Sequence, residues 1–201
     1  MRKKLLVLLV AGLVLAGCSG SATEGGLVGN GGQQNVADSE VSDANGTETA
    51  TEQQVYVLEF TDAVTTEGET LSEDVFANSK LTMVNVWATF CGPCINEMPD
   101  LGVIAGAYDA ADFQLIGIIA DTMEGDADML AEAKAIIEET GADYPHLLLN
   151  EELYMNLVGA SDSVPTTYFF NQDGELLGYV VGAKSQEAWE GIIDGLLEEL
   201  K

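Results

Sequence analysis

The stretch from Leu81 to Pro99 limits the possible folds most strongly, because an apolar strand pattern runs directly into two closely spaced cysteines. Met83 to Trp87 is apolar and β-branched apart from one asparagine, which is the composition of a buried strand. Cys91 and Cys94 follow in C-x-x-C spacing with a Gly-Pro dipeptide between them. The sequence therefore predicts a strand that continues into a helix through a cysteine pair.

This arrangement predicts redox chemistry. Pro93 suits the first turn of a helix, so Cys91 is expected at the helix N-terminus, where free backbone N–H groups stabilise an anion. The pKa of a cysteine at such a position falls to roughly 3.5–7.5, from about 8.5 for a free thiol. Disulfide exchange needs an attacking thiolate and a second thiol that resolves the mixed disulfide. We expect Cys91 to attack and Cys94 to resolve.

Two structural uses of the cysteine pair are less favoured. A disulfide between residues three apart closes a very small loop, so it constrains the unfolded chain little. A zinc site normally needs two such pairs or added histidines, and this chain offers only Cys18 and His146 besides. We expect His146 to be structural, and we predict no metal.

Three segments, in this order, resemble the thioredoxin superfamily and, within it, the membrane-anchored, extracytoplasmic TlpA/ResA-like thiol-disulfide oxidoreductases. They are Val84–Cys94, Glu97–Pro99 and Val164–Phe169. The resemblance covers about Val55 to Lys201. It implies an α/β, thioredoxin-like fold with a central mixed β-sheet flanked by helices and an N-terminal strand extension, and no cofactor beyond a redox-active disulfide.

The resemblance also implies roles for site residues. In relatives, a cis-proline segment lies against the active-site disulfide, and it resembles Val164, Pro165 and Thr166 of this chain. The alternative is a trans proline that only begins a strand. Asn85 stands where cytosolic thioredoxins carry a buried aspartate, and it cannot titrate. Glu97 stands where TlpA/ResA-like relatives carry a glutamate that tunes thiol reactivity, although the residue alone also fits a solvated helix position.

The remaining site-lining residues surround the cysteines. Trp87 and Phe90 are expected to pack near the pair, to shield the sulfur and to offer an apolar rim to a partner; the family more often has a second tryptophan where Phe90 stands. Gly92 and Pro93 form the dipeptide of reducing thioredoxins, whose potential is about −270 mV, against about −120 mV for the oxidase type. The dipeptide therefore favours reduction of partner disulfides.

The N-terminus predicts export and lipid attachment. Residues 1–17 have a basic start and an apolar run of about twelve residues, which is typical of a signal peptide and too short for a membrane span of about 20. Leu15 to Cys18 resembles a bacterial lipobox, with Cys18 as the lipidated residue, although an ordinary signal-peptidase site also fits. Two acyl chains would anchor the protein stably at the extracytoplasmic face of the cell membrane.

Residues 18–54 are expected to form a disordered tether, because they contain no aromatic and few aliphatic residues. A random coil of this length reaches about 30–36 Å. Residues 55–201 are then the one folded domain. Within it, we expect strands and helices at the following positions: strands at Val55–Phe60, Leu81–Ala88, Phe113–Ala120, His146–Leu149, Thr166–Phe170 and Glu175–Val181, and helices at Pro93–Tyr108, Ala127–Thr140, Glu151–Val158 and Ser185–Leu200.

The charge of the chain limits its partners. It carries 34 acidic against 7 basic side chains, a net charge of −27, which excludes nucleic acid as a favourable partner. An acidic surface attracts basic partners, although a generally acidic proteome or a salty habitat explains it at least as well. The resemblance implies protein thiols and disulfides as substrates and a membrane electron donor. Apocytochrome c, or a methionine sulfoxide or peroxide reductase, is the implied downstream partner.

Two other functions remain open from the residues alone. A copper chaperone would hold Cu(I) with Cys91, Cys94 and His146. A non-catalytic surface lipoprotein would use the fold only as a binding module. Direct peroxidase activity is less favoured, because the chain lacks the Thr-x-x-Cys setting of peroxiredoxins.

Overall fold

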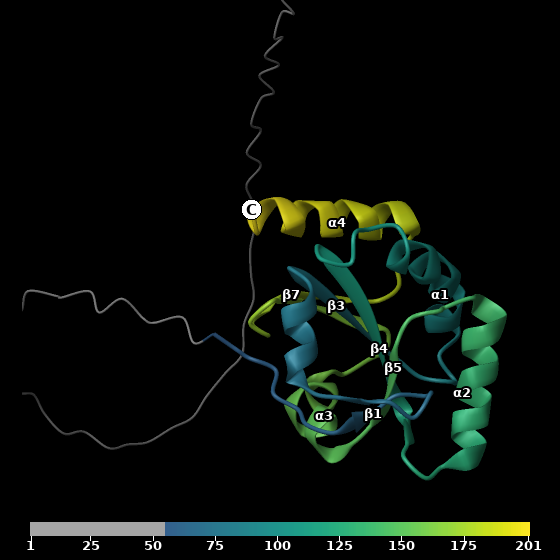
Figure 1. Cartoon of the computed structure of the whole chain (residues 1–201). Coiled ribbons are helices and arrows are strands. Elements are labelled where there is room, and N and C mark those ends of the chain that lie inside the picture. The colour runs from purple at the N-terminus through teal and green to yellow at the C-terminus, as the bar shows by residue number, and fades with distance from the viewer. Residues whose placement is uncertain (1–54) are drawn as a thin grey trace, which may run out of the picture. The chain divides into compact units, whose positions relative to one another are not determined.

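The structure is a computed structural model, and it describes residues 55–201 (Figure 1). The predicted signal peptide (1–17), the lipidation of Cys18 and the tether (18–54) lie outside the described residues. Across 55–201, no helix combines the length and the apolar character that a membrane crossing requires.

A five-stranded sheet with the order β5-β4-β3-β6-β7 forms the centre of the fold. Strands β3, β4 and β5 run parallel, whereas β6 is antiparallel to β3 and β7 is antiparallel to β6. This mixed sheet confirms the predicted α/β class. The strands are β3 (Leu81–Trp87), β4 (Phe113–Met123), β5 (His146–Leu149), β6 (Thr166–Asn171) and β7 (Leu176–Val181).

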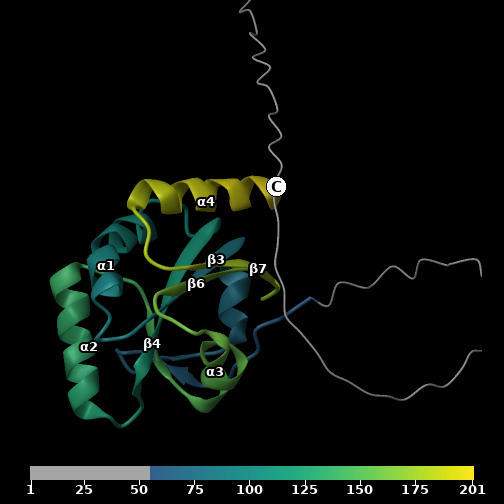
Figure 2. The ribbon, with the colours of Figure 1, turned by 180° about the vertical axis from the view of Figure 1, so that it is seen from behind.

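Both faces of the sheet are covered. The helices α1, α2 and α4 pack on one face, and the shorter elements, including α3, pack on the other, as the two opposite views show (Figures 1 and 2). The elements of the first layer are α1 (Gly92–Ala105), α2 (Ala127–Thr140) and α4 (Gln186–Glu199). Those of the second are η1 (Glu73–Asn78), α3 (Glu151–Asn156) and η2 (Val158–Ala160). The pair β1 (Ala63–Val64) and β2 (Thr70–Leu71) lies at the sheet edge, where Thr65 bridges to Leu147 of β5.

Strand β3 decides which side chains reach the cysteines. All seven of its residues are buried, and their side chains alternate between the two faces of the sheet. Val84 and Val86 belong to the core under α3 and η1, whereas Met83 packs under α1 and α4. Asn85 and Trp87 share the face of Met83, so the strand directs both of them toward the α1 layer.

The predicted strand at Val55–Phe60 is wrong. This segment makes a single bridge, from Val57 to Glu175, and then leaves the sheet edge because Leu58 and Phe60 turn into the core. The strand extension that exists is the two-residue pair of β1 and β2. The predicted bounds of α2 and β5 match the structure, and α1 ends at Ala105 rather than at residue 108.

Candidate active site

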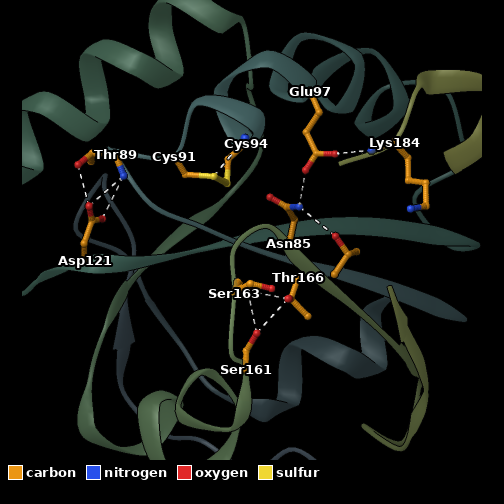
Figure 3. Close-up of a disulfide and its surroundings, with 11 residues drawn as sticks. Asn85, Thr89, Cys91, Cys94, Glu97, Asp121, Ser161, Ser163, Thr166 and Lys184 are labelled. Carbon is orange, nitrogen blue, oxygen red and sulfur yellow. Dashed lines mark hydrogen bonds between the residues drawn. A yellow bond between two sulfur atoms is a disulfide. The ribbon is translucent and has the colours of Figure 1, made fainter. Parts of the chain in front are cut away.

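Cys91 and Cys94 form a disulfide at the start of α1 (Figure 3). Cys91 is the N-cap of the helix, and its Sγ accepts a hydrogen bond of 3.2 Å from the backbone N–H of Cys94. Pro93 lies in the first turn, as its backbone restriction predicts. Cys94 is 0% exposed and Cys91 5% exposed, so Cys91 is the sulfur that a partner can reach.

The turn between β3 and α1 is held by Asp121, at the end of β4. The Asp121 carboxylate accepts a hydrogen bond of 2.7 Å from the Thr89 hydroxyl and bonds of 3.0 and 3.2 Å from the Thr89 backbone N–H (Figure 3). These bonds hold Thr89, a residue between β3 and the helix, in place. The next side chain, Phe90, consequently points into solvent and is 78% exposed. The prediction that Phe90 shields the sulfur is therefore wrong, although the side chain does provide an apolar rim.

Trp87 packs beneath the disulfide and is bonded to His146. Trp87 is fully buried in the cluster that contains both cysteines, and its Nε1–H donates a hydrogen bond of 3.1 Å to His146 Nδ1. Because Nδ1 accepts, the proton of the neutral ring is on Nε2, which donates to the Ala142 carbonyl at 3.0 Å. His146 is thus a structural residue of the site floor, as predicted.

Burial keeps His146 neutral. Loss of solvation lowers the pKa of His146 from 6.5 to about 4, against the opposing effect of its bond to the Ala142 carbonyl. The ring fits only because residue 117, on the neighbouring strand β4, is glycine: a Cβ at Gly117 would lie 2.2 Å from His146 Nδ1. Strand β4 therefore provides the space that the imidazole occupies.

Glu97 is buried one helical turn after Cys94 and receives three hydrogen bonds. Its Oε1 accepts from Asn85 Nδ2 at 3.2 Å, and its Oε2 accepts from the backbone N–H of Lys184 at 3.0 Å (Figure 3) and from Trp189 Nε1 at 3.3 Å. The side chain is 3% exposed, which excludes the alternative of a solvated helix glutamate.

Burial raises the pKa of Glu97, whereas the hydrogen bonds from Lys184, Asn85 and Trp189 and the charge of Lys184 lower it and so oppose the larger effect of burial. Asn85 also donates to the Thr167 hydroxyl at 3.0 Å. The helix that bears the cysteines therefore also carries Glu97, a carboxyl with a raised pKa. Asn85 of β3 links this carboxyl to Thr167 of β6.

The predicted proline segment lies beside the disulfide. The Val164–Pro165 peptide bond is cis, and Val164 packs against the cluster that contains Cys91 and Cys94. The loop before the proline is fixed by hydrogen bonds from the Thr166 hydroxyl to the Ser163 carbonyl (2.7 Å) and from Ser161 Oγ to Thr166 Oγ1 (2.9 Å) (Figure 3).

Three residues of this site, Asp121, Lys184 and Trp189, are not among those predicted from the sequence. Asp121 could have been predicted, because it is an acidic residue at the end of the apolar run of β4. The carboxyl end of β4 lies next to that of β3, where the cysteines follow. No sequence pattern indicated Lys184 or Trp189, since they contact Glu97 from 87 and 92 residues further along the chain.

Metal ligation by this site is not supported. Among residues 55–201, no three or more His, Cys, Asp or Glu side chains are grouped so that they could hold a metal ion. His146 uses both ring nitrogens on protein groups, so it offers no lone pair to a metal at the cysteine pair.

Comparison with known proteins decides the family. The sequence model of the AhpC/TSA family matches residues 51–178. The chain belongs to this family. Among curated relatives, "Thiol-disulfide oxidoreductase ResA" of Bacillus anthracis is 23% identical over 114 residues, and ResA of Oceanobacillus iheyensis is 29% identical over 119 residues. "Thiol:disulfide interchange protein HelX" of Rhodobacter capsulatus is 27% identical over 124 residues.

The matches cover 57–60% of this chain, and the matched parts span 57–62% of these relatives' own lengths.

Solved structures show the thioredoxin-like fold. A thioredoxin-family thiol:disulfide interchange protein from Chlorobium tepidum superposes with a TM-score of 0.61 at 24% identity, covering 73% of this chain and 99% of the other. A secreted Mycobacterium tuberculosis disulfide oxidoreductase gives 0.55 at 21% identity, covering 69% and 96%.

Proposed function

We propose that this AhpC/TSA-family protein is a thiol-disulfide oxidoreductase that reduces disulfides of partner proteins through Cys91 and Cys94. The observation that carries the proposal is the position of the pair: one sulfur caps a helix N-terminus, and the other is fully buried behind it. The names of the relatives, thiol-disulfide oxidoreductase and thiol:disulfide interchange protein, support the same chemistry.

In the reduced protein, the Cys91 thiolate attacks one sulfur of the partner disulfide, and the other partner sulfur leaves as a thiolate that takes up a proton. Cys94 then loses its proton and attacks Cys91 Sγ, which releases the second partner thiol and forms the Cys91–Cys94 disulfide. Two electrons pass to the partner in each cycle. A donor dithiol returns them to the protein.

Glu97 is proposed to take up the proton of Cys94. It lies three residues later on the same helical face, and its raised pKa makes it a better proton acceptor than an ordinary carboxylate. Asn85 Oδ1 accepts no hydrogen bond from residues 55–201, so a rotation of the amide would let Asn85 accept the O–H of a protonated Glu97. Pro165 and Val164 are proposed to lie against the bound partner.

The Gly92-Pro93 dipeptide supports the reducing direction. The proposed electron donor is a membrane protein, and the proposed partners are apocytochrome c or a methionine sulfoxide or peroxide reductase. Lipid on Cys18 and the residues up to 54 would hold the domain at the extracytoplasmic face of the membrane, as the lipobox-like sequence indicates.

The test is reduction of insulin and of oxidised glutathione by the protein, with dithiothreitol as the electron source. We expect Cys91→Ser to abolish turnover and Cys94→Ser to accumulate a mixed disulfide with the substrate. Cys18→Ser is the matched control, because it removes the third cysteine and leaves the pair intact. Full turnover by Cys91→Ser would contradict the proposal and favour a non-catalytic binding module.

A further inference from the structure

A groove of about 480 Å³ lies on the α3 face of the sheet, beside the proline segment. Its floor is formed by Thr166 and Tyr168 of β6 and by the facing residues Val181 and Tyr179 of β7. Tyr56, whose hydroxyl donates to the Asn156 carbonyl, closes the far end. The groove therefore runs along two strands and begins directly after the cis-proline.

The outer side of β7 continues this surface. The segment at Tyr56 covers only the start of the strand, where the backbone N–H of Leu176 donates to the Tyr56 carbonyl at 2.8 Å. Within residues 55–201, no strand pairs with the outer edge of β7 from Leu177 to Val181. Free backbone groups at a strand edge can bind an extended peptide by β-sheet addition.

The β7 side chains of this surface are largely apolar and exposed. Tyr179 is 63% exposed and Val181 is 54% exposed, and Tyr179 stacks on Tyr168 with ring centroids 5.8 Å apart. Aromatic side chains that combine an apolar ring with a polar hydroxyl are typical of peptide-contacting surfaces. Among residues 55–201, Asp162 is the only charged residue in the groove lining, and its side chain is exposed.

The groove begins one residue away from a side chain that packs against the cysteine cluster. Val164 packs against the cysteine cluster, and Ser163, immediately before it, lines the groove. The Pro165 carbonyl accepts a hydrogen bond of 2.8 Å from Gly182, which joins the proline loop to the end of β7. The proline loop therefore links the cysteine cluster to the groove, so a polypeptide bound to Cys91 as a mixed disulfide could extend along this loop into the groove.

We propose that the groove and the free edge of β7 bind, in extended form, the segment that flanks the reactive cysteine of a disulfide-bearing partner polypeptide. The proposal rests on the proposed function. The free edge from Leu177 to Val181 spans about 14 Å, the length of about five extended residues of a partner strand. The groove favours aromatic or aliphatic residues, and Asp162 together with the net charge of −27 favours lysine or arginine among them.

A second copy of this chain suits the groove poorly, because two molecules that each carry a net charge of −27 repel one another. A basic partner polypeptide gains from the same charge. The attraction falls with added salt, since exposed charges are screened within about 10 Å at 0.1 M ionic strength.

The test compares three disulfides in single-turnover reactions with the reduced protein. The first is a peptide whose cysteine forms a mixed disulfide with glutathione and is flanked on both sides by five residues rich in tyrosine, leucine and lysine. The second has serine and glutamate at those flanking positions. The third is oxidised glutathione, which is too small to reach the groove.

We expect the apolar-basic peptide to react at least about tenfold faster than the acidic one. Tyr179→Ser should lower the rate constant for the apolar-basic peptide, relative to that for oxidised glutathione, by about tenfold, which is the loss expected for a central, energetically dominant interface tyrosine. Tyr154→Ser is the matched control, because Tyr154 is 51% exposed and lies outside the groove lining. Asp162→Lys should shift the preference toward the acidic peptide.

Equal rate ratios for Tyr179→Ser and Tyr154→Ser would overturn the proposal. So would a dimer, seen by analytical ultracentrifugation, that Tyr179→Ser dissociates. If the protein reacted with none of the three disulfides, the proposed function itself would fail. If it reacted with all three and did not distinguish the two peptides, only the groove proposal would fail.

Discussion

Acid should weaken the fold through a single buried imidazole. His146 is 1% exposed and accepts a hydrogen bond from Trp87 on the nitrogen that a proton would occupy. Protonation of that nitrogen in the folded protein would place two N–H groups against each other. The folded state therefore resists the proton, whereas the unfolded chain binds it with the ordinary histidine pKa of 6.5.

The size of the effect follows from the two pKa values. The pKa of His146 is lowered from 6.5 to about 4 in the folded protein, and each unit corresponds to about 1.4 kcal/mol. Below pH 6.5 the unfolded state gains the proton first, so the free energy of unfolding falls as the pH falls toward 4. The loss due to this one group is about 3 kcal/mol.

The assay is urea unfolding of the wild type and of His146→Gln at pH 7.5 and pH 4.0. Glutamine can still accept from Trp87, and it does not titrate in this range. The acid-induced loss of stability should be about 3 kcal/mol larger in the wild type than in the variant, because the contributions of the carboxylates cancel in this difference. Equal losses in the two proteins would refute the assigned tautomer and the role of burial.

Three further predictions concern the site and its support. Glu97→Gln should shift the pH profile of thiol alkylation, because the buried carboxyl no longer titrates, whereas exposed Glu187→Gln should leave the profile unchanged. Asp121→Asn should lower the free energy of unfolding by about 2 kcal/mol, since three hydrogen bonds to a carboxylate are weakened, and urea unfolding measures it. Gly117→Ala should cost about 2 kcal/mol or more through the clash with the buried imidazole, while Gly178→Ala, with open space around its Cβ, should cost less in the same assay.

Features set by neighbouring residues could be predicted from the sequence. Pro93 in the first turn located the start of α1, and Gly141, with φ of 67°, ends α2 where predicted, because glycine adopts this left-handed conformation without strain. The apolar runs at β3 and β4 predicted two buried strands, and these two strands lie next to each other in the sheet. Each of these signals lies within a few residues of the feature that it predicts.

Features set by distant residues could not be predicted from the sequence. The orientation of Phe90 depends on Asp121, whose bond to the preceding residue spans 32 positions of sequence. The burial of Glu97 depends on Lys184 and Trp189, at least 87 positions away. The strand predicted at 55–60 failed for the same reason, since Leu58 and Phe60 turn into a core formed by distant residues, and local composition does not show that core.

The reduction potential of the Cys91/Cys94 couple tests the proposed function most directly. The protein is equilibrated in glutathione and dithiothreitol buffers, and thiol alkylation then reports the reduced fraction. A reductase of partner disulfides predicts a reversible couple at about −250 mV or below. A potential near about −120 mV would contradict the reducing direction. The absence of any reversible couple would contradict the oxidoreductase function itself.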